Sequence, residues 1–255
     1  MLERVLALIE RYHGLRLDAN LPALTPGRVA VVESPRRLRR EQSYAFVHAL
    51  WWTWLLDGRS VVSVPPGAGP AVQAAIGGVT AMEQLTDPAL IQVLRVALAP
   101  ALDQAGLPQP RRASHDLFFA CDGAALCPHN HGECRRLRDT AISPAEGLHL
   151  PTHCFPDGLV YGVVAESQVV SVAYAHRTNL MEEQVADLGV ETAPGYRRRG
   201  YAQTAVSAVV TEIARNGGVA YYSCSPDNHA SAATARSVGF MPYGRNFVLS
   251  SLQEG

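Results

Sequence analysis

A run of three arginines beside a glycine, in the stretch PGYRRRGYAQTA (194–205), contains the residue types most suited to chemistry. A helical pattern starts directly after the glycine, and the first N–H groups of a helix are unpaired and carry a partial positive charge. Phosphate binds well at a helix start. Gly200 would let a phosphate approach the main chain, and the arginines would add charge-assisted hydrogen bonds. We therefore expect a pyrophosphate-binding loop at residues 197–202, with a solvated basic helix start as the alternative.

The second half of the chain supplies the elements that must position this loop. Two apolar runs on either side of residues 166–168 predict an antiparallel hairpin over 158–178, and a third strand is expected at 183–192. Apolar residues at helical spacing predict an amphipathic helix that starts near Gly200 and is stopped by Gly217. A strand at 219–225, a short helix at 228–240 and a last strand at 244–252 follow. This order predicts an α/β domain with a mixed sheet, of the α+β type.

The first half of the chain is expected to form a smaller α/β domain. Helices are expected at 1–14, 35–56 and 87–106, a strand, glycine-containing loop and helix over 59–78, and a strand at 115–121. The basic stretch SPRRLRRE (34–41) is read as a solvated helix face. The loop-like stretch CDGAALCPHNHGEC (121–134) then separates the two domains, which we place at 1–130 and 131–255.

Composition narrows the class of protein. The 255 residues are 47% hydrophobic with a net charge of −1, so the chain is globular and has no overall field that would attract nucleic acid or anionic lipid. All 22 basic residues are arginine, which excludes a Schiff-base lysine and the lysine of a P-loop. No apolar run is long enough to span a bilayer, and the five cysteines come without a secretory signal. We therefore expect a cytoplasmic protein without a membrane or nucleic-acid partner.

Two motifs resemble a known family. The R-x-x-G-x-A pattern of Arg197, Gly200 and Ala202, which follows the strand and turn VETAPGY (190–196), resembles the acetyl-CoA signature of the GCN5-related N-acetyltransferases. Downstream, N-x-x-S…A-x-x-x-G-F, from Asn228 to Phe240, resembles the second motif of that family at a fitting distance. The resemblance covers roughly residues 131–255.

The resemblance implies direct transfer of an acetyl group from acetyl-CoA to an amine. The coenzyme would lie where two strands splay apart, and main-chain N–H groups of residues 198–202 would hold its pyrophosphate. Asn228 would bond the pantetheine. The implied coenzyme-binding residues are Val190, Glu191, Thr192, Arg197, Arg198, Arg199, Gly200, Tyr201, Ala202, Asn228 and Ser231. Positioning and stabilisation of the oxyanion would supply most of the rate.

The sequence departs from the family pattern at the positions of the acid and the base. Ala235 stands where many members carry a tyrosine that protonates the leaving thiolate, and Ala186 stands where some carry a glutamate base. Other candidates are Glu191 and Asp187 on the third strand, Tyr243 after the second motif, and Tyr222, Ser223 and Cys224 on the strand between. Strand alternation puts Asp187 and Glu191 on the face opposite Ala186 unless a bulge changes the parity. Proton transfer through water is the remaining route.

Cysteines and histidines gather in the stretch 121–134. Cys121, Cys127, His131 and Cys134 are residue types that ligate zinc, although the usual C-x-x-C pairs are absent. An ordinary interdomain loop without a metal is the interpretation we favour.

Several other functions stay open. The alanines at 186 and 235 suit a non-catalytic sensor that binds acyl-CoA, and small residues there also suit an acyltransferase with a longer acyl donor. A zinc-dependent interaction protein is a third alternative. The first domain is expected to cover one side of the substrate opening and to set specificity. The sequence does not identify the acceptor amine, and it leaves a homodimer open.

Overall fold

The computed structural model of the chain describes residues 2–40, 46–155, 158–177 and 184–252. It contains two compact units, and each unit combines two segments of the chain. The first unit comprises Met1–Tyr12 and Phe118–Pro242, and the second comprises His13–Leu117 and Tyr243–Gly255.

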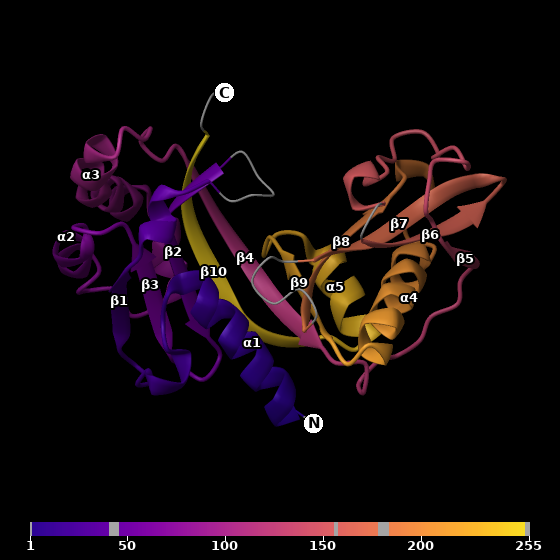
Figure 1. Ribbon diagram of the computed structural model, residues 1–255, viewed down its shortest axis with the longest axis horizontal. Helices are drawn as coiled ribbons and strands as arrows, with labels where there is room; N and C mark the ends of the chain where they lie inside the picture. The colour runs from indigo at the N-terminus through magenta and orange to yellow at the C-terminus, as the bar shows by residue number, and fades with distance from the viewer. Residues whose placement is uncertain (1, 41–45, 156–157, 178–183, 253–255) are drawn as a thin grey trace. The chain divides into compact units, whose positions relative to one another are not determined.

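The first unit is built on a sheet with the strand order β9-β8-β7-β6-β5. The strands are β5 (Glu133–Arg136), β6 (Leu159–Ala165), β7 (Gln168–Arg177), β8 (Val185–Thr192) and β9 (Val219–Cys224). Neighbours pair antiparallel except β8 and β9, which run parallel and are joined by helix α4 (Tyr201–Arg215). Helix α5 (His229–Val238) follows β9, and Figure 1 shows α4 and α5 together on one side of these strands. The predicted mixed α/β class is confirmed.

Local sequence explains the elements around the predicted loop. The turn between β6 and β7 consists of Glu166 and Ser167, whose φ angles of 52° and 62° are those of the two-residue turn that matches the twist of a hairpin. Helix α4 packs its apolar stripe, which includes Ala205, Val209 and Ile213, against β6, β7 and β8. The predicted hairpin and helix are therefore confirmed.

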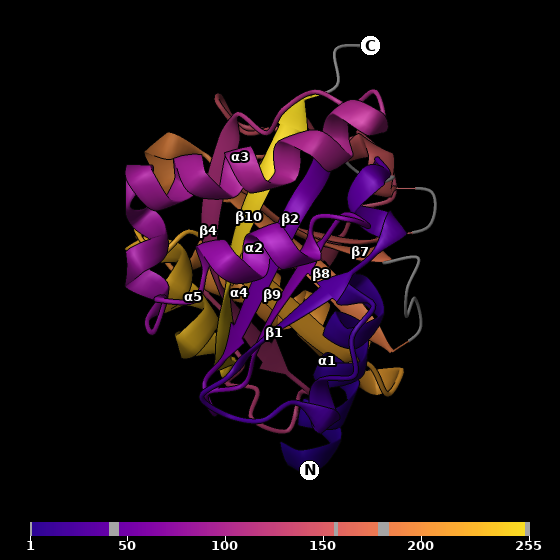
Figure 2. The same cartoon turned by 90° about the vertical axis from the view of Figure 1, so that its left-hand side faces the viewer.

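The second unit has the strand order β1-β3-β2-β10. Its elements are β1 (Val29–Glu33), β2 (Phe46–Leu55), β3 (Ser60–Val64), α2 (Gly69–Ala75), α3 (Pro88–Gln104), and parts of α1 (Leu2–Leu17), β4 (Arg112–Cys121) and β10 (Met241–Leu252). Figure 2 shows α2 and α3 lying across this sheet. Between the helices and the sheet, Trp52 is fully buried and donates its indole N–H to Ser60 Oγ at 2.6 Å. The remaining short elements are the 3-10 turns η1 (Leu21–Ala23), η2 (Pro35–Leu38), η3 (Met82–Thr86), η4 (Thr152–Cys154) and η5 (Pro194–Tyr196).

The helix predicted over 35–56 is wrong. This segment forms η2 and then β2, whereas residues 41–45 lie outside the described residues. β2 pairs with β3 on one side and with β10 on the other, and most of its residues are buried on both faces. A strand buried on both faces is a continuous apolar run, and such a run has no period that separates it from a buried helix. β1 and β5 were also not predicted, because both are short and largely not buried.

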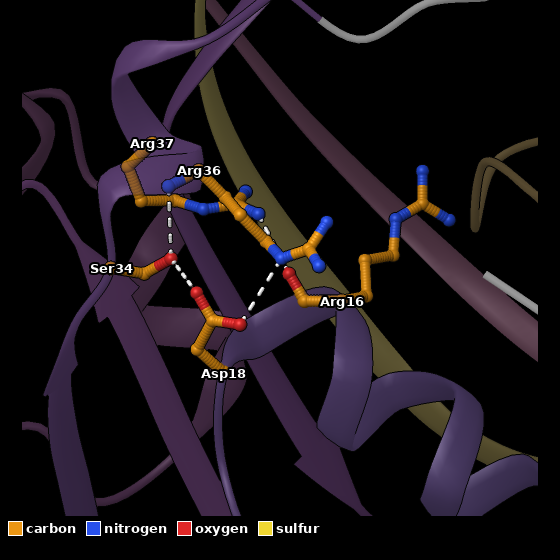
Figure 3. A network of polar contacts seen from close by, with 5 residues as sticks. All are labelled: Arg16, Asp18, Ser34, Arg36 and Arg37. Carbon is orange, nitrogen blue, oxygen red and sulfur yellow. Dashed lines mark hydrogen bonds and ion pairs between the residues drawn. The ribbon is translucent and has the colours of Figure 1, made fainter. Parts of the chain in front are cut away.

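The basic stretch 34–41 is not a solvated helix face. Ser34 caps the short turn η2, and its hydroxyl also donates to Asp18 (Figure 3). Arg36 Nε donates to Asp18 Oδ1 at 3.1 Å. Arg37 is only 2% exposed and donates from Nη2 to the main-chain oxygen of Arg16 at 2.7 Å. Two of the arginines therefore tie η2 to the end of α1 within the second unit.

The compact units do not follow the contiguous division into 1–130 and 131–255. The chain passes between units at Tyr12–His13, at Leu117–Phe118 and at Pro242–Tyr243, so α1, β4 and β10 each have residues in both. The predicted boundary near residue 130 stays a prediction. Within the described part of the chain, no helix combines the length and the apolar character needed to cross a bilayer.

Candidate functional site

The parallel strands β8 and β9 separate before either strand ends. Their paired residues are Val185–Leu188 on β8 and Val219–Tyr222 on β9. β8 continues to Thr192 and β9 to Cys224 without a further pair between them in the described residues. We call the region beside the unpaired ends of β8 and β9 the opening, with the end of β8 forming one edge.

The register between β7 and β8 decides which backbone groups face that opening. Ala193 donates its N–H to Val170 O at 2.9 Å, and no register shift interrupts the pairing of β8 with β7. Because backbone groups alternate in direction along a strand, Glu191 turns its N–H and C=O toward β7, and Val190 and Thr192 turn theirs toward the opening. Of the three predicted backbone contacts, two thus point into the opening and one points away.

The loop between β8 and α4 leaves a helix start without a capping side chain. Gly200 is the residue before α4 and has φ of 79°, and Arg198 has φ of 62°. Gly200 has no side chain to cap the first N–H groups of α4, which begins at Tyr201. Arg197, Arg198 and Arg199 are all exposed. This combination offers unpaired donors, a helix dipole and three cations to an anion.

Gly200 is required by its neighbours as well as by its backbone conformation. A Cβ at this position would lie 2.4 Å from His131 Cδ2, so the histidine ring packs directly against the glycine. His131 donates its main-chain N–H to Thr204 Oγ1 at 2.9 Å. Any side chain at residue 200 would therefore disturb the loop before a ligand is considered. Sequence reasoning placed His131 only among zinc ligands and missed this contact.

The second motif forms the start of α5. Asn228 caps the helix, with Oδ1 accepting the N–H of Ser231 at 3.1 Å, and Ser231 Oγ lies 2.7 Å from the hydroxyl of Tyr222. Burial raises the pKa of Tyr222 to about 12. Ala235 is fully buried one turn further along α5. Because the cap uses Asn228 Oδ1, the Nδ2 amide is the group left to donate to a ligand.

The catalytic candidates occupy different places. Leu188 is paired with Tyr222, which contacts α5, so Ala186, Leu188, Val190 and Thr192 share the face of the helices. Asp187 and Glu191 lie on the opposite face, as strand alternation predicted, since no bulge changes the parity. Tyr243 belongs to the second unit, Cys224 is buried and Ser223 is exposed.

Two residues that sequence reasoning missed lie on the face of Glu191. His149 Nδ1 is 3.3 Å from Glu191 Oε1. Tyr174 packs over Gly189, where a Cβ would come within 2.2 Å of the ring. Burial, followed by the charges of Cys154, Glu191 and Asp187, raises the pKa of Tyr174. The only sequence signal was the concentration of histidines in the middle of the chain.

The four suggested zinc ligands are spread along the segment that crosses α4 and α5. Cys121 ends β4 and is buried, Cys127 is exposed, Cys134 lies in β5, and His131 packs on Gly200. Burial raises the pKa of the Cys134 thiol to about 11 and raises that of Cys121 as well. Among the described residues, no group of three or more histidine, cysteine or acidic side chains is placed to hold a metal ion.

The segment instead rests on the helices. Cys127 donates its N–H to Val238 O at 2.9 Å, and His129 Nε2 lies 3.0 Å from Ser237 O.

A strand pair that separates beside a basic helix start has the donors and the charge to hold an anionic ligand. Residues 151–245 match the family model described as GNAT acetyltransferase. This match confirms the resemblance that the two sequence motifs predicted. No curated protein sequence matches the chain.

Solved structures described as GNAT acetyltransferases resemble the chain over part of its length. A protein described as an acetyltransferase of the GNAT family from Novosphingobium aromaticivorans is 22% identical, with 57% of this chain and 68% of that chain covered and a TM-score of 0.47. A GNAT-family acetyltransferase from Colwellia psychrerythraea is 15% identical, with coverage of 59% and 60% and a TM-score of 0.43. A GCN5-related N-acetyltransferase from Kribbella flavida is 18% identical, with coverage of 66% and 77% and a TM-score of 0.43.

Proposed function

We propose that this protein transfers the acetyl group of acetyl-CoA to an amine. One observation carries the proposal. The pairing of β8 with β9 ends at Leu188 and Tyr222, on the edge of the sheet where the arginine-rich loop starts α4. Donors for a thioester arm and donors for a pyrophosphate therefore line one continuous stretch of chain, from Val190 to Ala202.

The residues of the loop and of β8 fit the two ends of such a coenzyme. The main-chain groups of Val190 and Thr192 extend the sheet toward the pantetheine, and the Nδ2 amide of Asn228 donates to it from α5. The N–H groups of Tyr201 and Ala202 and the guanidinium groups of Arg197–Arg199 bind the diphosphate. Acetyl-CoA supplies an acyl group activated as a thioester.

The transfer needs one proton removed before the amine attacks and a second one delivered afterwards. The acceptor ammonium loses a proton, and its lone pair forms the N–C bond to the acetyl carbon. The carbonyl electrons move to oxygen, where a backbone N–H of β8 stabilises the charge. When these electrons re-form the C=O bond, the C–S bond breaks. The thiolate that leaves takes up the second proton of the nitrogen. Ala186 and Ala235 supply neither proton transfer, so positioning carries much of the rate.

Titration calorimetry with acetyl-CoA, paired with a thiol-release assay on a panel of amines, tests the proposal. We expect micromolar binding of acetyl-CoA and amine-dependent release of thiol. Binding without release for any amine would favour the sensor that the alanines at 186 and 235 suggested. Tighter binding and faster release with longer acyl-CoA donors would favour an acyltransferase of a different donor class.

We further propose that the N-terminal region sets acceptor specificity, in a cytoplasmic protein that uses no nucleic-acid or membrane partner. A truncation at residue 130 does not test this cleanly. It would remove Met1–Tyr12 and Phe118–Asn130 from the first unit, where Tyr221 packs against both Tyr12 and Phe118. Exchange of exposed residues within 13–117 is the better test, and a changed order of preference among acceptor amines is the expected result.

A further inference from the structure

A histidine–carboxylate pair stands at the end of β8 on the face turned away from α4 and α5. His149 Nδ1 lies 3.3 Å from Glu191 Oε1, and the two side chains are 88% and 37% exposed. An exposed ion pair of this kind contributes little stability by itself. Its position beside the opening gives it another use, because both groups can reach a ligand and solvent.

The loop that carries His149 is fixed at the end of β8. Ala145 donates its N–H to Val169 O at 2.9 Å, and Leu148 donates to Ala145 O at 3.1 Å. Gly147 has φ of 74°, and a Cβ there would lie 3.1 Å from Pro194 Cδ, so the loop packs closely on the chain that follows β8. The pair is therefore held by several contacts of the main chain.

Glu191 is fixed from the other side as well. Ser171 Oγ donates to Glu191 O at 3.1 Å and lies 2.7 Å from Thr192 Oγ1. Glu191 stands between Val190 and Thr192, the two residues whose backbone groups face the opening. Glu191 is therefore one residue away from each of the two backbone positions that line the opening.

We propose that Glu191 accepts the proton of the acceptor ammonium and that His149 positions the carboxylate. This inference rests on the proposed acetyl transfer. The ammonium N–H bond breaks toward Glu191 Oε2, while the ring of His149 holds Oε1 through Nδ1, and the carboxyl then releases the proton from Oε2 to water. The amine keeps the electron pair with which it attacks the acetyl carbon. The second proton goes to the thiolate, so the balance needs no further reactant.

Two titratable groups beside the pair do not act as bases at neutral pH. Tyr174, whose pKa is raised by burial, and Cys154, whose pKa burial raises to about 11, both stay neutral at neutral pH. Asp187 lies on the same face of β8, four residues before Glu191. Its negative charge favours an ammonium ligand. The titratable groups that face this region are His149, His153, Cys154, Tyr174, Asp187 and Glu191.

Separate measurement of kcat and KM tests the pair, with ethylamine, tyramine and spermidine as acceptor probes in the thiol-release assay. Glu191→Gln should lower kcat by about 10²- to 10³-fold. His149→Gln should lower kcat by about tenfold while the KM for the amine stays within about twofold, because the variant loosens the carboxylate without removing it. His153→Gln, the same exchange at a histidine whose ring meets Tyr174 edge-on, should change neither kcat nor KM.

Chemical rescue separates chemistry from folding. In Glu191→Ala, added formate should restore at least about a tenth of the lost rate, because a small carboxylate can occupy the vacated position. A kcat of His149→Gln equal to that of wild type, or a Glu191→Ala rate that formate does not change, would overturn the inference. Acetyl-CoA affinity should stay within about twofold in every variant, since Glu191 turns its backbone away from the coenzyme. A wild-type protein that does not bind acetyl-CoA would instead refute the proposed function.

Discussion

Both units of the molecule contain a helix that starts after a strand of a parallel pair, and the two helix starts differ. In the second unit, β1 and β3 stay paired over five residues, from Val29–Ser60 to Glu33–Val64. The helix that follows, α2, has its start closed internally, because Gly69 donates its N–H to Glu33 Oε1 at 2.9 Å. In the first unit, β8 and β9 separate after four pairs, and three arginines in place of a carboxylate precede α4.

The difference shows that a strand, a glycine-containing loop and a helix do not by themselves make an anion site. The donors at the helix start must be left unused, and the strands must separate far enough for a ligand to enter. In the second unit the carboxylate of Glu33 already neutralises the helix dipole. We therefore expect the coenzyme to bind in the first unit and not at α2.

The largest expected effect is on the stability of the second unit, in the core beneath α2. Trp52 is fully buried in the core beneath α2 and α3 and bonds Ser60. Trp52→Ala should lower the free energy of unfolding by about 3–5 kcal/mol, because it leaves a cavity and removes the indole donor to Ser60. Urea denaturation measures this. Leu56→Ala, at a side chain 64% exposed, should stay within about 0.5 kcal/mol of wild type. A loss below about 1 kcal/mol for Trp52→Ala would show that this layer is not a packed core.

The next effect concerns the open helix start. Arg198→Glu combined with Arg199→Glu should weaken acetyl-CoA binding by about 100-fold or more, since two charge-assisted contacts become repulsions. Calorimetry measures the change. Arg215→Glu is a matched charge reversal at the far end of α4, where the guanidinium pairs with Glu212 at 3.5 Å. Equal losses for both proteins would point to general charge and not to the loop. Gly200→Asp is a poorer probe, because its side chain would collide with His131.

A smaller effect separates helix capping from coenzyme contact at α5. Asn228→Ala removes the acceptor for the N–H of Ser231 and should cost about 1 kcal/mol of stability. Asn228→Asp keeps an oxygen in the same place, so its stability should stay near that of wild type, while the lost Nδ2 donor and added charge weaken acetyl-CoA binding. Thermal unfolding and calorimetry of both variants measure the two effects. Unchanged affinity in Asn228→Asp would remove this residue from the coenzyme site.

The smallest effect tests the closed helix start. Glu33→Ala removes the carboxylate from the first N–H of α2 and should lower the free energy of unfolding by about 0.5–1 kcal/mol. It should create no second site for acetyl-CoA, because β1 and β3 remain paired. Denaturation and the calorimetric stoichiometry check both statements, and a second binding event would contradict the comparison.

The sequence predicted the first unit better than the second for a physical reason. Helix α4 is recognisable by apolar residues at helical spacing and a glycine after its end. The β6–β7 hairpin is recognisable by two apolar runs around a polar turn. β2 is buried on both faces and has no such period, so its apolar run was read as a helix. Arg37 was read as solvated because charge predicts exposure, and only tertiary contacts show it buried with bonds to Arg16.

The contiguous part of the candidate site was predictable from the sequence, whereas its contacts between distant segments were not. The residues from Val190 to Ala202 form one segment, so their motif was readable. The contact of His149 with Glu191 joins residues 42 positions apart, and that of His131 with Gly200 joins a loop to a helix start. Neither contact follows from a local pattern. They depend on how the loops between β4 and β6 fold back on the sheet.

Hydrogen exchange with and without saturating acetyl-CoA tests the central comparison most directly. We predict slower exchange of the amides at Val190, at Thr192 and at Tyr201–Gln203, because these donors gain a ligand. We predict no change at Gly69–Val72, where Glu33 already holds the helix start. Protection at the start of α2, or none between Val190 and Gln203 in a protein that binds acetyl-CoA, would contradict the difference between the two helix starts.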